Sequence, residues 1–264
     1  MVGQQAAQSL GEKLLLRLSK SPGSPDFRPG HVNYTLDTAL SLLCRVFPDF
    51  MKSIAGKEIL DFGCGSGYQA VSLALKGAKR VVGLDSNAEC LSEARKLAAQ
   101  VGLADRVRFI DHLDDSFLNR FEVIISKDSM EHYPDPSLAL HQMQRVLKKD
   151  GILFITFGPP WLAPYGGHMH FFTKLPWVHL LFTEATVLKV RARFRSDGAR
   201  RYQDVEGGLN KMTVAKFERL VSQSRLKVLY RNHECVKGIT LPAKLPGIRE
   251  FFINQVSYVL AKVM

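Results

Sequence analysis

The sequence predicts an α/β fold in which a parallel sheet carries helices on both faces. Short apolar runs alternate with helical stretches between residues 58 and 157, and this alternation is typical of parallel sheets. A glycine-rich loop follows the first of these runs and opens a helix. With 46% apolar and 23% charged residues in 264, the chain can bury a sizeable core and is too apolar for a disordered protein.

The N-terminal part is expected to be helical. Residues 4–20 place several leucines on one helix face, and the Pro- and Gly-rich run Ser21–Pro25 would end this helix. A second helix is expected across Tyr34–Phe47.

The alternating region follows these helices. Strands are expected at Glu58–Phe62, Arg80–Leu84, Val107–Ile110, Phe121–Ser126 and Gly151–Phe157. Helices are expected at Tyr68–Lys76, Ala88–Val101 and Pro136–Lys148. Ser86 or Asn87 would cap the second of them, and Pro136 suits the first turn of the third.

Residues 158–211 break the pattern with aromatic residues, Gly and Pro. The pattern then resumes with a helix, a strand, a helical stretch and a last strand, at Val214–Ser222, Leu226–Arg231, Ile248–Asn254 and Gln255–Val263. We therefore expect one domain over residues 1–264. Its parts are N-terminal helices (1–50), a core (55–157), an insertion (158–212) and the C-terminal part of the sheet (213–264).

Composition argues for a cytoplasmic protein. No apolar run approaches the roughly 20 residues that span a bilayer, and the most apolar stretch, Leu175–Phe182, contains His179. The N-terminus has no run that resembles a signal-peptide core. The four cysteines form no Cys-x-x-Cys pair, so we expect reduced thiols without a disulfide framework or a zinc site.

The positive charge is concentrated in the last third. Residues 1–173 carry 19 Lys and Arg against 18 Asp and Glu, whereas residues 174–264 carry 17 against 7. Much of this excess lies in Lys189–Arg201. A solvated face, an attraction to an anionic or lipid-like acceptor at a membrane surface, and nucleic-acid binding are the alternatives. The absence of a nucleic-acid-binding motif places the last of them behind the others.

The loop Asp61-Phe62-Gly63-Cys64-Gly65-Ser66-Gly67 carries most of the functional information. Glycines at such a loop let the backbone approach a ligand closely. A dinucleotide fingerprint would need a third glycine at position 68, which is Tyr68. This spacing argues against a nicotinamide-dependent oxidoreductase. Asp85 ends the next expected strand, and a carboxylate there can accept hydrogen bonds from both hydroxyls of a ribose.

Together with Phe121–Ser126, Glu131–Pro136 and Leu147–Leu153, this loop resembles the motifs of the class I S-adenosylmethionine-dependent methyltransferases, the "type 11" group in particular. The resemblance covers about residues 55–157. It implies a Rossmann-like sheet of seven strands, mostly parallel, with an antiparallel C-terminal strand. It also implies S-adenosyl-L-methionine as cofactor and S-adenosyl-L-homocysteine as product.

The resemblance also implies roles for individual residues. Asp61 would hold the loop and face the cofactor's ammonium group, and Asp85, next to Ser86, would bind the ribose. Asp111, next to His112, would lie at the adenine, with Asp114 as the alternative. The methionine part would be lined by Gly63, Cys64, Gly65 and Gly67.

The segment that leaves the fifth strand should emerge beside the reactive methyl group, because ligands bind at the carboxyl ends of the strands. It contains both tryptophans and many other aromatics, which either line an acceptor pocket or form the core of an inserted cap. His168 and His170 would face the same way on an extended segment, and either could act as a base. Tyr165 is another candidate.

Other readings of the same region stay open. A histidine pair could chelate a metal, but no third ligand has convincing spacing, so we expect none. His132 and Asp128 are candidates near the methyl group, each with a structural alternative. The predicted function is methyl transfer to a small organic or lipid-like acceptor by in-line displacement. The alternatives are a non-catalytic module that binds the cofactor and a methyltransferase that acts on nucleic acid.

Overall fold

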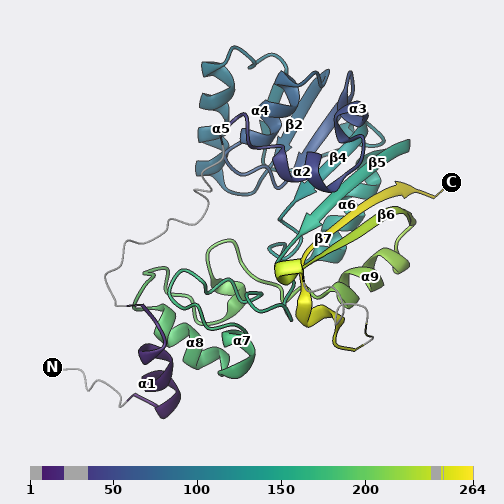
Figure 1. Cartoon of the computed structure of the whole chain (residues 1–264). Coiled ribbons are helices and arrows are strands. Elements are labelled where there is room, and N and C mark those ends of the chain that lie inside the picture. The colour runs from purple at the N-terminus through teal and green to yellow at the C-terminus, as the bar shows by residue number, and fades with distance from the viewer. Residues whose placement is uncertain (1–7, 21–34, 239–244, 246, 264) are drawn as a thin grey trace.

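The strands form one sheet (Figure 1). The computed structural model describes residues 8–20, 35–238, 245 and 247–263, and in these residues seven strands lie in the order β3-β2-β1-β4-β5-β7-β6. Their bounds are β1 Glu58–Phe62, β2 Arg80–Leu84, β3 Val107–Ile110, β4 Phe121–Lys127, β5 Leu147–Phe157, β6 Leu226–Cys235 and β7 Ile253–Lys262. The predicted Rossmann-like fold class is confirmed.

Strand direction places the ligand-binding edge. β7 pairs antiparallel with β5 and β6, and the pairs from β3 through β5 are parallel. β2 and β3 lie on one side of β1, and β4 and β5 lie on the other. The carboxyl ends of β1 and β4 therefore meet at a switch point, which is where open α/β sheets bind ligands.

Helices from different parts of the chain cover the two faces of the sheet (Figure 1). One face packs against α2 (Ser41–Val46), α3 (Phe50–Ile54), α4 (Tyr68–Leu75) and α5 (Ala88–Gln100). The other face packs against α6 (Pro136–Val146) and α9 (Val214–Gln223). Side-chain oxygens of Asn87, Asp135 and Thr213 cap the starts of α5, α6 and α9, which satisfies amides that have no partner within the helix.

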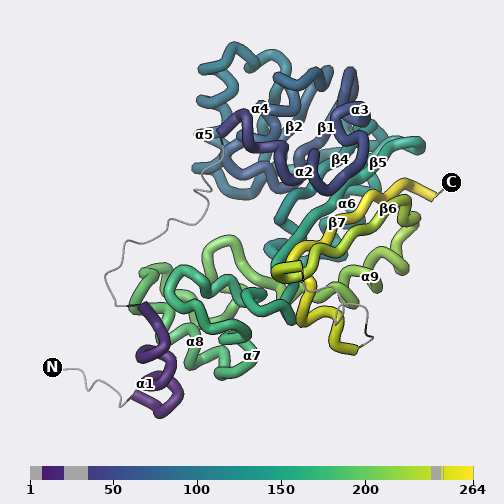
Figure 2. Tube along the Cα trace, in the orientation of Figure 1, coloured from purple at the N-terminus to yellow at the C-terminus, as the bar shows by residue number. Residues whose placement is uncertain are grey.

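A group of short helices forms a cap with its own apolar core, beyond the end of β5 (Figure 2). We define this cap as residues 8–20 and 158–212; it contains α1 (Leu10–Arg17), α7 (Val178–Leu181) and α8 (Glu184–Arg191). The Thr173 hydroxyl donates a hydrogen bond to the Leu18 carbonyl (3.0 Å), and Ser19 forms a β-bridge with Thr173. These contacts hold α1 to a segment that lies about 155 residues further along the chain.

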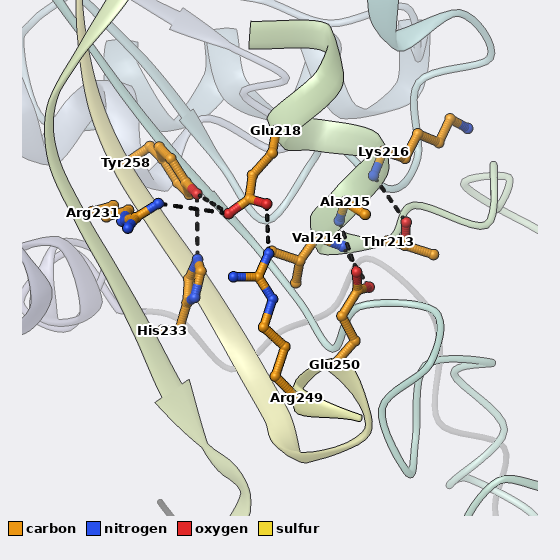
Figure 3. Close-up of polar contacts among 10 residues, drawn as sticks. All are labelled: Thr213, Val214, Ala215, Lys216, Glu218, Arg231, His233, Arg249, Glu250 and Tyr258. Atoms are coloured by element: carbon orange, nitrogen blue, oxygen red, sulfur yellow. Dashed lines mark hydrogen bonds and ion pairs between the residues drawn. The ribbon is translucent and has the colours of Figure 1, made fainter. Parts of the chain in front are cut away.

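The segment before β7 is tied to α9 by two glutamates (Figure 3). Buried Glu250 accepts hydrogen bonds from the amides of Val214 (2.9 Å) and Ala215 (2.8 Å). A carboxylate is favoured there because a helix N-terminus carries unsatisfied N–H groups and positive potential. One turn later, Glu218 forms an ion pair with Arg249 and accepts a hydrogen bond from the Tyr258 hydroxyl (3.2 Å). The network fixes the C-terminal strand against the sheet's second helical layer.

Several elements differ from the sequence predictions. The helix predicted at Pro136–Lys148 ends at Val146, and the helical stretch predicted at Ile248–Asn254 is limited to Arg249–Phe252 because β7 begins at Ile253. The second predicted helix is confined to Ser41–Val46, and Phe50–Ile54 forms a separate short helix. β5 begins at Leu147, four residues before its predicted start, because Leu147 pairs with Phe121 across an irregular register. β6 continues to Cys235 because it pairs with β7 along that length. The predicted helix at 4–20 begins at Leu10; its residues 4–7, the Ser21–Pro25 run and Tyr34 lie outside the described residues.

Within the described part of the chain, no helix has both the length and the hydropathy needed to cross a membrane.

Candidate functional site

The glycine loop between β1 and α4 is held against the end of β2. The amides of Gly63 (2.8 Å) and Cys64 (3.0 Å) donate to the Leu84 carbonyl. Gly65 has φ +50°, and a Cβ atom added there would meet nothing within 4 Å. The backbone at Gly65 therefore adopts a conformation that favours glycine and faces open space into which a ligand can approach. Gly67 ends the loop as the residue before α4, and Cys64 is buried, which raises the pKa of its thiol.

Asp85 connects the loop to the end of β2. One carboxylate oxygen accepts a hydrogen bond from the Gly65 amide (2.8 Å), and the other accepts from the Asn87 amide (2.9 Å). Each carboxylate oxygen has two lone pairs, so Asp85 can fix the loop and still accept hydrogen bonds from a ribose. The neighbouring Ser86 is exposed.

Asp61 is a buried carboxylate beneath the loop. Only 1% of its surface is exposed. Its Oδ1 accepts a hydrogen bond from the Gln69 amide (2.6 Å), whereas Oδ2 is buried without a partner. Burial raises the pKa of Asp61 to about 7. An unpartnered buried oxygen beside an open glycine loop fits a cationic ligand group, because a nearby positive charge stabilises the ionised carboxylate.

The end of β3 offers two acids in different settings. Asp111 is exposed and pairs with the neighbouring His112 (2.6 Å). Asp114 caps the short 3₁₀ helix Asp115–Phe117 by accepting hydrogen bonds from Ser116. Since Asp114 already serves the backbone, Asp111 remains the preferred residue for the adenine.

The turn after β4 contacts the glycine loop from the other side of the switch point. The Tyr133 hydroxyl donates to the Phe62 carbonyl (2.8 Å). A Cβ atom added to Gly63 would lie 2.7 Å from the Ser129 hydroxyl. The cofactor loop and the acceptor-side residues thus belong to one packed unit.

Asp128 and Glu131 are the acids of this turn. Asp128 has φ +51°, and its carboxylate accepts hydrogen bonds from Thr156 (2.9 Å) and Gln255 (2.8 Å). Glu131 is buried; its Oε1 accepts a hydrogen bond from the Gly158 amide (2.9 Å), and its Oε2 has no partner. Burial, together with the charge of Asp128, raises the pKa of Glu131 to about 8.

The sequence predictions give Glu131 no role, although Glu131 and His132 belong to one of the motifs that carry the resemblance. Glu131 follows the end of β4 by four residues, so its position near the carboxyl edge of the sheet could have been predicted. Only the structure shows its burial, however, and burial is what gives this carboxyl group a pKa near the operating pH.

His132 and His168 meet at the boundary between the core and the cap. Their ring centroids are 5.4 Å apart, edge to face. The Nδ1 atom of His132 lies 2.7 Å from the Gly208 carbonyl, and Nε2 of His168 is buried without a partner. Burial lowers the pKa of both rings, to about 3 for His168. Both rings are therefore neutral near pH 7 and able to orient a bound group.

His170 and Tyr165 are exposed. The extended segment on which His168 and His170 would face the same way is not what the structure has at His168. His168 has φ +55°, so the segment is a turn and the alternation of an extended strand does not apply. Of the five candidate catalytic residues, the structure brings together Asp128, His132 and His168.

The aromatic residues after β5 pack mainly against one another. Phe172 is fully buried and stacks on Phe194 (5.2 Å between centroids), and Trp161 meets the rings of His179 (4.6 Å) and Tyr202 (4.8 Å). Of the two readings given above, the core of an inserted cap therefore accounts for these side chains.

The basic run divides into buried and exposed members. Arg191 is buried and forms a bidentate ion pair with Asp197, in which each guanidinium nitrogen lies 2.5 Å from a carboxylate oxygen. These hydrogen bonds lower the pKa of Asp197 to about 2. Arg195 is also buried, 4.7 Å from the Phe171 ring centroid. Arg193 and Arg200 are exposed. Part of the run therefore stabilises the cap, and two of its exposed members, Lys189 and Arg201, form ion pairs with Glu12 and Asp204.

Two further observations limit the choice of sites. A depression of about 580 Å³, lined by Lys52, Lys57, Lys148 and Lys149 among others, lies at the amino-terminal edge of β4 and β5. It contains none of the candidate residues. In the described residues, no group of three or more His, Cys, Asp or Glu side chains is placed to hold a metal ion.

Residues 54–158 match a family model described as a methyltransferase domain. Over 107 residues the chain is 36% identical to the ubiquinone biosynthesis O-methyltransferase of Actinobacillus pleuropneumoniae serotype 7. That alignment covers 38% of this chain and 45% of the relative. The enzyme of the same name from Alkalilimnicola ehrlichii is 37% identical over 106 residues, which cover 39% of this chain and 42% of the relative. The chain thus spans less than half the length of these relatives.

Solved structures share the fold over most of the chain. An S-adenosylmethionine-dependent methyltransferase from Mesorhizobium loti has a TM-score of 0.56 and 18% identity, and the match covers 86% of this chain and 99% of that one. A geranyl diphosphate methyltransferase in complex with its cofactor has a TM-score of 0.53 and 17% identity, with 89% and 93% covered. The [4+2]-cyclase SpnF has a TM-score of 0.54 and 16% identity, with 87% and 80% covered. At such identities the likeness shows the fold alone.

Over residues 54–158 the chain matches a methyltransferase domain, and it shares its fold with S-adenosylmethionine-dependent methyltransferases of known structure. The predicted resemblance to methyltransferases is thereby confirmed for this segment. The matched region runs from just before β1 to the end of β5 and contains the loop, Asp61, Asp85, Asp128, Glu131 and His132.

Proposed function

We propose that the chain transfers a methyl group from S-adenosylmethionine to a hydroxyl oxygen of a small, lipid-like acceptor in the cytoplasm. The curated relatives are ubiquinone biosynthesis O-methyltransferases, which supports an oxygen acceptor of this kind. The observation that carries the proposal is geometric. The open glycine loop lies at the same carboxyl edge of the sheet as the turn after β4, which carries Glu131 and His132. Tyr133 of this turn donates to the Phe62 carbonyl beside the loop, and His132 meets His168 of the cap.

The loop side fits the cofactor. We propose that Asp61 accepts the ammonium group through its unpartnered oxygen and that Asp85 accepts the ribose hydroxyls. The bound cofactor supplies an electrophilic methyl group, and the protein's part is to hold the acceptor oxygen in line with it in a dry pocket.

The acceptor side supplies the proton chemistry. A base works best when its pKa lies near the operating pH. Glu131, with a pKa of about 8, meets this condition, whereas His168, with a pKa of about 3, is a poor proton acceptor. We propose that Glu131 takes the proton from the acceptor hydroxyl and that His132, His168 and Asp128 orient the acceptor and the carboxyl group.

A screen for products tests the proposal. The chain is incubated with S-adenosylmethionine and separate pools of phenols, catechols with prenyl tails, amines and lipid-linked alcohols. We expect formation of S-adenosylhomocysteine, with a mass gain of one CH₂ group, in the catechol or phenol pools. Product formation in the amine pool alone would contradict the choice of oxygen. A nucleic acid as the sole acceptor would contradict the choice of substrate class.

Replacing Asp85 with Ala should weaken cofactor binding by about 10- to 150-fold. The loss of a hydrogen bond to a charged group costs about 1.5–3 kcal/mol, and Asp85 serves both the loop amide and the proposed ribose contact. Calorimetric titration with S-adenosylhomocysteine measures the effect. Asp105→Ala removes an exposed acid between α5 and β3 and should leave the affinity unchanged. Equal affinity of both variants would remove Asp85 from the site.

The exposed arginines of the cap should mediate salt-sensitive contact with an anionic membrane surface. Reversal of Arg193 and Arg200 to Glu should weaken binding to vesicles that contain anionic lipid, and the wild-type attraction should fade as salt is raised, because exposed charges are screened over about 8 Å at physiological ionic strength. Co-sedimentation measures the bound fraction. The matched control reverses two other exposed lysines, Lys76 and Lys79, which follow the C-terminal end of α4 and lie outside the cap. An equal loss of vesicle binding in both variants would show that the binding depends on the net charge of the protein and not on the arginines of the cap.

A further inference from the structure

Lys127 is a half-buried cation at the carboxyl end of β4, and the sequence predictions give it no role. It is the last residue of β4, and its Nζ donates a hydrogen bond to the Ala39 carbonyl (3.2 Å). Lysine is rarely taken out of water unless an anion accompanies it. Burial lowers the pKa of Lys127, and the charges of Asp128 and Asp61 act in the opposite direction.

Strand register places Lys127 on the same face of the sheet as Asp61. Asp61 of β1 pairs with Ile125 of β4, and side chains two residues apart on a strand point to the same face. The hydrogen bonds agree with this placement. Asp61 is bonded to Gln69 of α4, and Lys127 is bonded to Ala39, two residues before the start of α2. Both helices pack on this face.

The turn that leads into α2 lies over this pair of charges. Ser72 of α4 donates its hydroxyl hydrogen bond to the Leu36 carbonyl (2.7 Å), and Lys127 holds the same turn at Ala39. The acid with an unpartnered oxygen and the lysine ammonium therefore interact electrostatically under one cover, and Asp61 is two residues before the first glycine of the loop.

We propose that Lys127 binds the carboxylate of the cofactor's amino-acid end, while Asp61 accepts its ammonium group. The two side chains then recognise a zwitterion, with each charge opposite its complement. An ammonium group has three donors, so Lys127 can keep its bond to Ala39 and bind a carboxylate as well. This inference rests on the proposed function, since it assigns a further contact to the same cofactor.

Three ligands separate this role from a structural one. S-adenosylhomocysteine carries both charges, its decarboxylated analogue S-adenosyl-3-thiopropylamine carries only the ammonium group, and 5′-methylthioadenosine carries neither. Wild-type protein should bind S-adenosylhomocysteine about 10- to 150-fold more tightly than the thiopropylamine, as expected for one charge-assisted contact. Lys127→Met, which keeps an unbranched apolar stem, should abolish that preference and leave binding of the other two ligands within about twofold.

The outcomes are distinct. Equal weakening of all three ligands in Lys127→Met would assign Lys127 to holding the turn and overturn the inference. An unchanged preference for S-adenosylhomocysteine would also overturn it. Binding of methylthioadenosine reports that the variant is folded, and the wild-type comparison tests the carboxylate contact without any substitution. Failure of wild-type protein to bind any of the three ligands would instead overturn the proposed function.

Discussion

A valine at position 65 should abolish cofactor binding. Gly65 has φ +50° and faces open space, so valine would carry a branched side chain into the ligand's approach while its backbone is forced into a region that β-branched residues avoid. We expect no saturable binding of S-adenosylhomocysteine by calorimetry and loss of the thermal stabilisation that the ligand gives the wild type.

The control for this variant is Gly102→Val. Gly102 follows α5, has φ +70°, and would also place its Cβ in open space, so it suffers similar backbone strain away from the loop. It should bind the cofactor normally. If both variants lose binding equally, strain rather than the loop accounts for the effect; if both bind normally, the loop does not hold the cofactor.

Replacing Glu131 with Gln should lower turnover by about 10²- to 10⁴-fold, the range for a positioned base. Glutamine keeps the shape of the protonated side chain and can still accept the hydrogen bond from Gly158, but it takes up no proton. Turnover is measured with an acceptor found in the screen, and cofactor affinity should stay within a few-fold of the wild type. Glu206→Gln, an exposed substitution in the cap, should leave turnover unchanged.

The dependence on pH gives an independent check on Glu131. A base must be ionised, so wild-type turnover should rise with pH through about 8, and this rise should be absent in Glu131→Gln. Because the folded-state pKa lies above that of the unfolded chain, Glu131 makes folding less favourable as pH rises toward 8. The melting temperature of Glu131→Gln, relative to that of the wild type, should therefore be higher at pH 8 than at pH 5. Near-normal turnover in Glu131→Gln would exclude Glu131 as the base and make His132 the next candidate.

Sequence was sufficient to position the residues of the proposed cofactor half of the site in the fold. The strands Glu58–Phe62, Arg80–Leu84 and Val107–Ile110 have the predicted bounds, because buried parallel strands read as uninterrupted apolar runs. The loop and Asp85 lie directly at the ends of such runs, so their positions follow from topology. Asp85's contact with the Gly65 amide connects two residues that sequence reasoning had placed in one site.

The residues of the proposed acceptor half could not be predicted fully, because their burial and long-range contacts leave no local pattern in the sequence. His168 and His170 looked equivalent in sequence, yet a turn with φ +55° at His168 buries one ring and exposes the other. Glu131 and Lys127 gain their chemical character from burial by segments far along the chain, Gly158 in one case and Ala39 in the other. Arg195 belonged to an apparently uniform basic run but packs on Phe171 inside the cap. Such contacts require the three-dimensional structure because they join residues with no common local signal.

The most direct test of the central claim is an equilibrium titration of the wild-type protein with S-adenosylhomocysteine and, separately, with NADH. The glycine spacing, the unpartnered oxygen of Asp61 and the position of Asp85 predict saturable binding of S-adenosylhomocysteine with one site per chain and no binding of NADH. Binding of NADH without binding of S-adenosylhomocysteine would contradict the account.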